Sequence, residues 1–368
     1  MGSAHRGPAP PGRGRGGQGP GLKTLKIPGV RWPWLLGGVL AVLVAAIAGL
    51  AFGPVSLPPG GVAVELLDLI PGVNLHSGLS ERDAAILLQL RLPRVVLALL
   101  AGAMLALAGG CYQGAFRNPL ADPYLLGAAA GAGLAVTAVV ALRGADLGAL
   151  PPSVPLAAFA GALIAVALTY LLGVGGRDRS PASLILAGVA VSAFLAAGQT
   201  YLMQRNADDI RAIYSWLLGR LATNGWHEVR LLLPYAVVTT VVVLALRREL
   251  DVLSVGDDEA SGLGLHPQRS RFILIAAASL GTAAAVSVSG LIGFVGIVVP
   301  HIVRMLAGGS YRAILPLSML FGAAFLALAD LAGRTFAAPA EIPIGVVTAF
   351  VGGPFFVLVL RSAKRVIT

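Results

Sequence analysis

The residues of this chain that could carry out chemistry are few and far apart. Five histidines are scattered along it, namely His5, His76, His227, His266 and His301. No Walker A motif, HExxH pair or GxSxG turn occurs in the sequence. The single cysteine, Cys111, excludes an intrachain disulfide, has no partner at metal-ligand spacing, and is expected to pack inside a helix. We therefore expect no catalysis and no bound cofactor or metal, so that any energy input comes from a partner protein or an ion gradient.

Charged and helix-breaking residues gather in four short segments instead. In the first, Arg91-Leu-Pro-Arg94 precedes an apolar run, after which Pro119 and Pro123 interrupt any helix. Taken alone, the residues around these two prolines are most simply a tightly packed turn.

The second segment runs from Asp251 to Arg271. Its acidic residues Asp257, Asp258 and Glu259 suit the positive N-terminal end of a short helix, which the glycines after them can terminate. The pattern predicts a compact helix with an acidic first turn, and a solvated connector is the alternative.

The third and fourth segments place polar residues inside apolar runs. His301 lies within Gly290–Arg304, where a paired or interfacial histidine is favoured over a metal ligand. Asp330 and Glu341 lie near expected helix ends, close in sequence to Arg334. Pairing of these acids with an arginine is favoured over a role in proton relay.

The composition places these segments in a membrane. Hydrophobic residues make up 57% of the chain and charged residues 12%, whereas a soluble domain carries about 25% charged residues. Ten apolar runs predict ten transmembrane helices, at Trp34–Phe52, Val95–Cys111, Tyr124–Leu142, Val154–Val174, Leu184–Met203, Leu231–Leu246, Phe272–Val288, Leu291–Leu306, Ile314–Leu331 and Ile342–Leu360. Several are shorter than the roughly 20 residues that span lipid unaided, so we expect a bundle in which irregular backbone is shielded by protein.

The expected fold is an all-α, polytopic membrane domain over residues 31–368, in two inverted five-helix halves. Inversion follows because five helices per half is an odd number. Residues 1–30 are too rich in glycine and proline to bury a core and are expected to form a disordered, basic cytoplasmic tail. With ten helices both termini lie in the cytoplasm, and most basic residues then fall in cytoplasmic segments. The net charge of +10 fits this topology, so membrane lipid rather than nucleic acid is the expected surrounding.

Taken together, the charged segments resemble the FecCD/BtuC family of permeases, which import iron-siderophores, haem and vitamin B12. The resemblance covers the chain from about residue 35 and rests on six pieces: LRLPR (90–94), RNPLADPYLLG (117–127), WLLGRL (216–221), LSVGDDEASGLGL (253–265), GLIGFVGIVVPHIVR (290–304) and EIPIGVVTA (341–349). It implies a homo- or heterodimer of permeases in the bacterial cytoplasmic membrane, with two cytoplasmic ABC ATPase subunits and an extracytoplasmic substrate-binding protein. The partner ATPase uses ATP, and the permease does no covalent chemistry on its cargo.

The resemblance also implies roles for individual residues. Arg91, Arg94 and Arg334 match the arginines on which acidic side chains of the binding protein dock. Residues 251–265 match the element that couples to a groove of the ATPase, and the matching positions are Ser254, Gly256, Asp257, Asp258, Glu259 and Gly264. The positions that fall in segments lining the family's cytoplasmic gate are Asn118, Leu120 and Ser180, although Pro181 and Ala182 replace hydroxyl residues expected there.

Cargo and energy source leave alternatives open. An iron(III)-siderophore is the expected cargo, with cobalamin or haem as alternatives for the same type of importer. An ion-coupled secondary transporter, with Asp330 or Glu341 as proton carrier, also explains ten spans and inverted halves. It does not explain the acidic segment at 251–265 or the arginines expected outside. An intramembrane enzyme would need an acid–base or metal cluster, and the sequence shows none.

Overall fold

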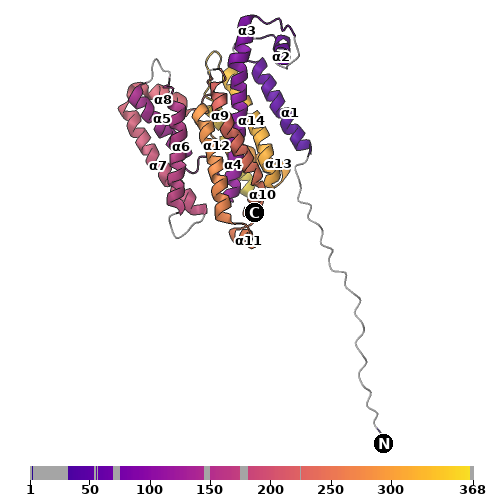
Figure 1. The fold of residues 1–368 in the computed structure, drawn as a ribbon, viewed down its shortest axis with the longest axis vertical. Coiled ribbons are helices and arrows are strands. Elements are labelled where there is room, and N and C mark those ends of the chain that lie inside the picture. The colour runs from indigo at the N-terminus through magenta and orange to yellow at the C-terminus, as the bar shows by residue number, and fades with distance from the viewer. Residues whose placement is uncertain are drawn as a thin grey trace.

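The computed structural model is all helical over the residues that it describes (Figure 1). Those residues are 2, 32–53, 55, 57–68, 75–144, 150–174, 181–223 and 225–364. The predicted tail at 1–30, apart from Gly2, and the predicted gate residue Ser180 lie outside the described residues.

Over the described residues, ten apolar helices form the bundle. Seven stretches are long and apolar enough to cross a membrane: α1 (Trp32–Ala51), Glu81–Ala115, α6 (Val154–Val174), α7 (Pro181–Arg205), α9 (His227–Ala245), α12 (Pro267–Ser289) and α14 (Tyr311–Thr335). The second of these joins α3 (Glu81–Ala85), a π-helical turn (Ile86–Arg91) and α4 (Leu92–Ala115). Three apolar helices are shorter in their described part: α5 (Ala128–Arg143), α13 (Val295–Ala307) and α15 (Ile344–Lys364). Each of the ten predicted spans coincides with one of these helices.

Short helices connect the long ones. They are α2 (Pro59–Asp68), a 3₁₀ turn (Ala207–Asp209), α8 (Ile210–Leu217), α10 (Arg247–Leu253) and α11 (Asp257–Gly262). Helices α2 and α3 lie at one end of the bundle, and α11 lies at the other (Figure 1).

Two helices begin about four residues later than predicted. The third span begins at Ala128 rather than Tyr124, because Gly127 before it has a left-handed backbone with φ of 85°. The eighth begins at Val295 rather than Leu291, because Phe294 has φ of 69° and ends an irregular turn. Tyr124 holds the two turns together, since its hydroxyl donates to the Ile292 carbonyl and accepts from the Ile292 amide, both at 3.1 Å. Non-helical backbone is thereby covered by protein, as a membrane interior requires.

The packing of the helices repeats between the halves. Helices α5, α6 and α7 pack together in the first half, as α13, α14 and α15 do in the second. The second apolar helix of each half, α4 or α12, packs against the other half. Helix α4 packs against α14, α12 packs against α6, and α4 and α12 also pack against each other. This exchange of equivalent contacts fits the two inverted halves predicted from the odd helix number.

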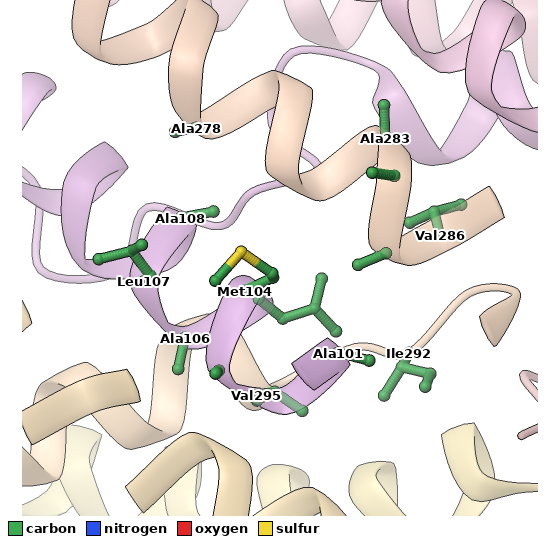
Figure 2. Packing of buried hydrophobic residues seen from close by; sticks show 14 of the residues in the cluster. Ala101, Met104, Ala106, Leu107, Ala108, Ala278, Ala283, Val286, Ile292 and Val295 are labelled. Carbon is green, nitrogen blue, oxygen red and sulfur yellow. The ribbon is translucent and has the colours of Figure 1, made fainter. Parts of the chain in front are cut away.

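Small residues bring the central helices close together. Figure 2 shows part of the buried cluster around Met104, to which α4 contributes Ala101 and Ala108 and α12 contributes Ala278 and Ala283. Where α4 crosses α14, a Cβ atom on Gly102 would overlap the carbonyl of Gly322. Without a hydrophobic driving force between lipid-embedded helices, such close approach supplies much of the packing energy.

We expect Gly102→Ala to lower the free energy of unfolding by about 1–3 kcal/mol, the usual cost of overpacking. The new methyl group must push α14 away, because it meets backbone rather than a movable side chain. Thermal unfolding in detergent measures the change. Gly37→Ala in α1 is the matched control, because open space surrounds a Cβ there. Equal melting temperatures for the two variants would contradict the close crossing.

Candidate functional site

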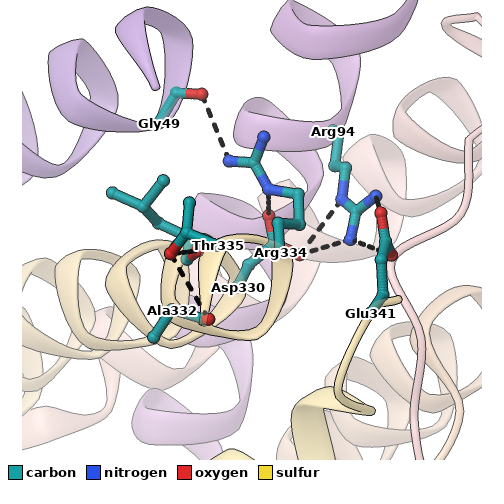
Figure 3. Close-up of polar contacts among 8 residues, drawn as sticks. Gly49, Arg94, Asp330, Ala332, Arg334, Thr335 and Glu341 are labelled. Carbon is teal, nitrogen blue, oxygen red and sulfur yellow. Dashed lines mark hydrogen bonds and ion pairs between the residues drawn. The ribbon is translucent and has the colours of Figure 1, made fainter. Parts of the chain in front are cut away.

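A cluster of four charged residues joins three elements at the α2–α3 end of the bundle. Arg94 of α4 donates to Asp330 Oδ1 from Nε at 3.0 Å and from Nη2 at 2.9 Å. It also donates to Glu341 from Nη1 at 2.9 Å and Nη2 at 2.8 Å. Asp330 of α14 forms a second ion pair with Arg334 one turn later, at 2.9 Å (Figure 3). We call these four residues the Arg94 cluster.

Burial differs sharply within the Arg94 cluster. The side chains of Asp330 and Arg334 are each 4% exposed, that of Arg94 is 21% exposed and that of Glu341 is 48% exposed. Glu341 lies between α14 and α15, where hydrogen bonds from Arg94 hold the pKa of its carboxyl below the usual value. It is therefore charged at neutral pH, and the cluster contains two cations and two anions.

Two buried arginines bind the end of α1. Arg91 donates to the carbonyl of Leu50 at 2.8 Å and that of Ala51 at 3.3 Å, and also to that of Val55. Arg334 donates to the carbonyl of Gly49 at 3.2 Å. The last carbonyls of a helix lack partners within it, and cations near them are favourable. Arg91 and Arg334 thus cap α1.

The three arginines with a predicted docking role are therefore gathered at one end of the bundle, but differently placed. Arg91 and Arg334 are buried, while Arg94 is partly exposed. The capping contacts could not be read from the sequence, because Arg334 and the carbonyl of Gly49 are 285 residues apart.

At the opposite end, a second cluster anchors α11. Arg271 of α12 donates to both carboxylate oxygens of Asp257, from Nη2 at 2.8 Å and from Nη1 at 3.1 Å. Its Nε donates to the carbonyl of Ala115, the last residue of α4, at 2.9 Å. Arg117 forms a further ion pair with Asp257 at 3.5 Å. Hydrogen bonds from Arg271 hold the pKa of Asp257 below its usual value, so α11 is tied to α12 and α4 by a charged group.

The rest of the predicted coupling segment surrounds this anchor. Helix α11 is compact with an acidic first turn, as predicted, and Gly264 with φ of 84° follows its end. Gly256 is buried at its start.

The exposed members of the predicted set are Ser254, Asp258, Glu259 and Gly264. Two exposed apolar side chains accompany them, Val255 at 66% and Leu263 at 73%. An exposed surface of carboxylates and apolar side chains suits contact with a partner protein. Sequence reasoning missed the anchoring residues Arg117 and Arg271.

Asp251 connects this end of the bundle to α14. Its Oδ1 accepts from the backbone amide of Tyr311 at 2.6 Å, and its Oδ2 accepts from the Ser310 hydroxyl at 3.0 Å. Asp251 thus satisfies a free amide at the start of α14, whose other end carries Asp330 and Arg334.

Two of the predicted gate residues, Asn118 and Leu120, lie in the turn after α4. Asn118 Oδ1 accepts from the Leu120 amide at 3.0 Å, which shapes the turn, and the Leu120 side chain is exposed. Asp122 Oδ1 accepts from the Tyr124 amide at 2.7 Å, and burial raises the pKa of Asp122 to about 6.

An apolar hollow of about 480 Å³ lies between the end of α8, the 291–294 turn and α15. It is lined by Leu217, Leu218, Leu291, Gly293, Phe294, Gly345, Val346, Ala349, Phe350 and Pro354. This lining contains no charged side chain. Within the described part of the chain, no three His, Cys, Asp or Glu residues are grouped to hold a metal ion, and the ring of His301 packs edge-on against Phe355. The hollow therefore offers shape and apolar contact rather than ligands.

The apolar helices of the described residues define a polytopic membrane protein. The FecCD transport family matches residues 39–362, and the chain belongs to this family. It is 40% identical to the cobalamin import system permease protein BtuC of Halobacterium salinarum, over 88% of this chain and 86% of that protein. It is 39% identical to the Fe(3+)-citrate import system permease protein YfmE of Bacillus subtilis, over 89% and 95%.

Two further proteins extend the comparison. The hemin transport system permease protein HmuU of Yersinia pestis is 38% identical, over 78% of this chain and 87% of that protein. A solved structure, described as an inward-facing conformation of a metal-chelate type ABC transporter, is 29% identical with a TM-score of 0.76, covering 89% of this chain and 98% of that one.

Proposed function

We propose that this chain is the membrane-spanning subunit of an ATP-driven importer for an iron(III) chelate of the siderophore type. It pairs with a second permease subunit, two cytoplasmic ATPase subunits and an extracytoplasmic binding protein. The relatives are named as permeases for iron-citrate, hemin and cobalamin, which are all bulky metal complexes.

The apolar lining of the hollow beside α15 is the observation that carries the cargo class. A bare iron ion would need carboxylate, imidazole or thiolate ligands, and the lining residues supply none. A chelate encloses its metal and presents a large outer surface. It can therefore bind an apolar surface through complementary shape, without metal ligands from the protein. Cobalamin is the second candidate, because the Halobacterium relative is named for it.

The same proposal orients the chain. The acidic helix α11 faces the cytoplasm and the ATPases, and the Arg94 cluster faces outward to the binding protein. Helix α1 ends at the Arg94 cluster and so begins at the α11 end (Figure 1). Helix α15 begins three residues after Glu341 of the cluster and so ends at the α11 end as well. Both termini then lie on the cytoplasmic side of the bacterial plasma membrane.

Uptake by proteoliposomes that contain the whole transporter tests the cargo. We expect ATP-dependent uptake of radioactive iron(III)-hydroxamate to exceed that of cyanocobalamin or haem by at least about tenfold, roughly 1.4 kcal/mol of discrimination. The binding protein and ATPase are taken from the same genome and kept constant. Preferred uptake of cyanocobalamin would replace the siderophore by the second candidate.

A further inference from the structure

Glu341 covers the outward face of the one partly exposed arginine in the Arg94 cluster. Asp330 holds the guanidinium of Arg94 through Nε and Nη2, and Glu341 holds it through Nη1 and Nη2. Asp330 is buried, whereas nearly half of the Glu341 side chain is exposed. The two carboxylates thus approach Arg94 from the protein interior and from the solvent side.

The two ion pairs of Arg94 differ in how readily they exchange. An exposed ion pair contributes little to stability, because water and salt screen it. The Glu341 pair is the more exposed, while the buried Asp330 pair keeps Arg94 oriented when Glu341 leaves. Loss of Glu341 would change the cluster from two cations and two anions to a net positive charge.

Space for an incoming carboxylate lies beside this pair. A hollow of about 270 Å³ is lined by Arg94, Asp330 and Glu341 together with Arg220. Arg220 is exposed. Its backbone amide donates to the Ser289 carbonyl at 2.8 Å, which fixes the loop that carries Arg220. A carboxylate entering this hollow would meet Arg220 as well as Arg94.

We propose that the ion pair of Glu341 with Arg94 stands in for one that an acidic side chain of the binding protein forms with Arg94. Docking then exchanges the Glu341 carboxylate for the carboxylate of the binding protein. This rests on the proposed function, in which the binding protein docks at this end. Glu341 precedes α15 by three residues, and the Gly345 amide donates to the Leu218 carbonyl at 2.9 Å beside the apolar hollow. Release of Glu341 therefore removes the side-chain tie just before a helix that lines the apolar hollow, while the backbone bonds of Ile342 and Gly345 remain.

Glu341→Gln is expected to tighten docking, which a merely structural role for the pair would not do. The amide cannot compete for Arg94 as a carboxylate does, so the dissociation constant of the binding protein should fall about threefold to tenfold. Biolayer interferometry measures it on the whole transporter in nanodiscs, with the binding protein from the same genome. Arg94→Gln in the Glu341→Gln background should abolish the gain. The gain should also shrink at high salt.

Glu81→Gln is the matched control. It removes the same charge from an exposed position at the same end, in the first turn of α3, and should leave affinity unchanged. Unchanged or weaker docking of Glu341→Gln would overturn the exchange, as would equal tightening by Glu81→Gln. Glu341→Asp, with a shorter reach to Arg94, should tighten docking to a smaller extent, and this variant decides the matter if the glutamine variant folds poorly. Absence of docking by the unaltered transporter would instead refute the proposed function.

Discussion

Replacing Asp257 by alanine is expected to lower cargo uptake at least about tenfold while ATP hydrolysis by the assembled transporter continues. Asp257 is the carboxylate through which Arg271 and Arg117 tie α11 to α12 and to the turn after α4. Without it, α11 can still meet the ATPase through its exposed residues but no longer moves as one body with the bundle. A tenfold loss corresponds to about 1.4 kcal/mol of coupling.

Paired assays on the same proteoliposomes give the ratio of cargo moved to ATP hydrolysed. Asp208→Ala is the control, because it removes an aspartate from the 3₁₀ turn between α7 and α8, away from α11. Asp257→Glu, which keeps the charge, should recover part of the ratio. If Asp257→Ala transports with the normal ratio, the Asp257 anchor is not needed for coupling.

Arg91→Glu is expected to prevent stable folding of the permease. Its guanidinium is buried and donates to the carbonyls of Leu50, Ala51 and Val55 at the end of α1. A carboxylate there would face carbonyl oxygens without a donor, and an uncompensated buried charge costs about 3–5 kcal/mol. We expect little folded protein after detergent extraction, as measured by fluorescence-detected size exclusion.

Arg82→Glu makes the same charge reversal at an exposed position of α3 and should fold normally. Arg91→Met, which keeps the apolar stem but loses the donors, should fold with a lower melting temperature. A well-folded Arg91→Glu variant with weakened docking would instead favour a direct docking role for Arg91. Reversing Arg91 and Arg94 together would mix the two effects, so Arg94 alone is the cleaner test of docking.

The helices could be predicted from the sequence because hydropathy is a local property. Each predicted apolar run became a helix, since lipid forces the backbone to satisfy its own hydrogen bonds. The starts of α5 and α13 were misplaced because they depend on Tyr124 meeting Ile292, 168 residues away. No local pattern contains that contact.

The charged residues were located correctly, but their partners were not all foreseen. The predicted pairing of Asp330 and Glu341 with an arginine is confirmed, and Arg94 is the shared partner, 236 and 247 residues away. The acidic first turn of α11 could be predicted because three carboxylates follow one another at a helix start. The role of Arg271 as the anchor of α11 could not be predicted, because it depends on the packing of α12 against α4. The docking, coupling and gating roles remain proposals.

Cargo uptake with and without the ATPase tests the central claim most directly. Proteoliposomes hold this permease with its binding protein, and labelled iron chelate is followed as ATPase subunits and ATP are added or left out, with and without a proton gradient. The account predicts uptake only when ATPase and ATP are both present, whatever the gradient. Accumulation by the permease alone, driven by the gradient, would contradict it and favour an ion-coupled carrier.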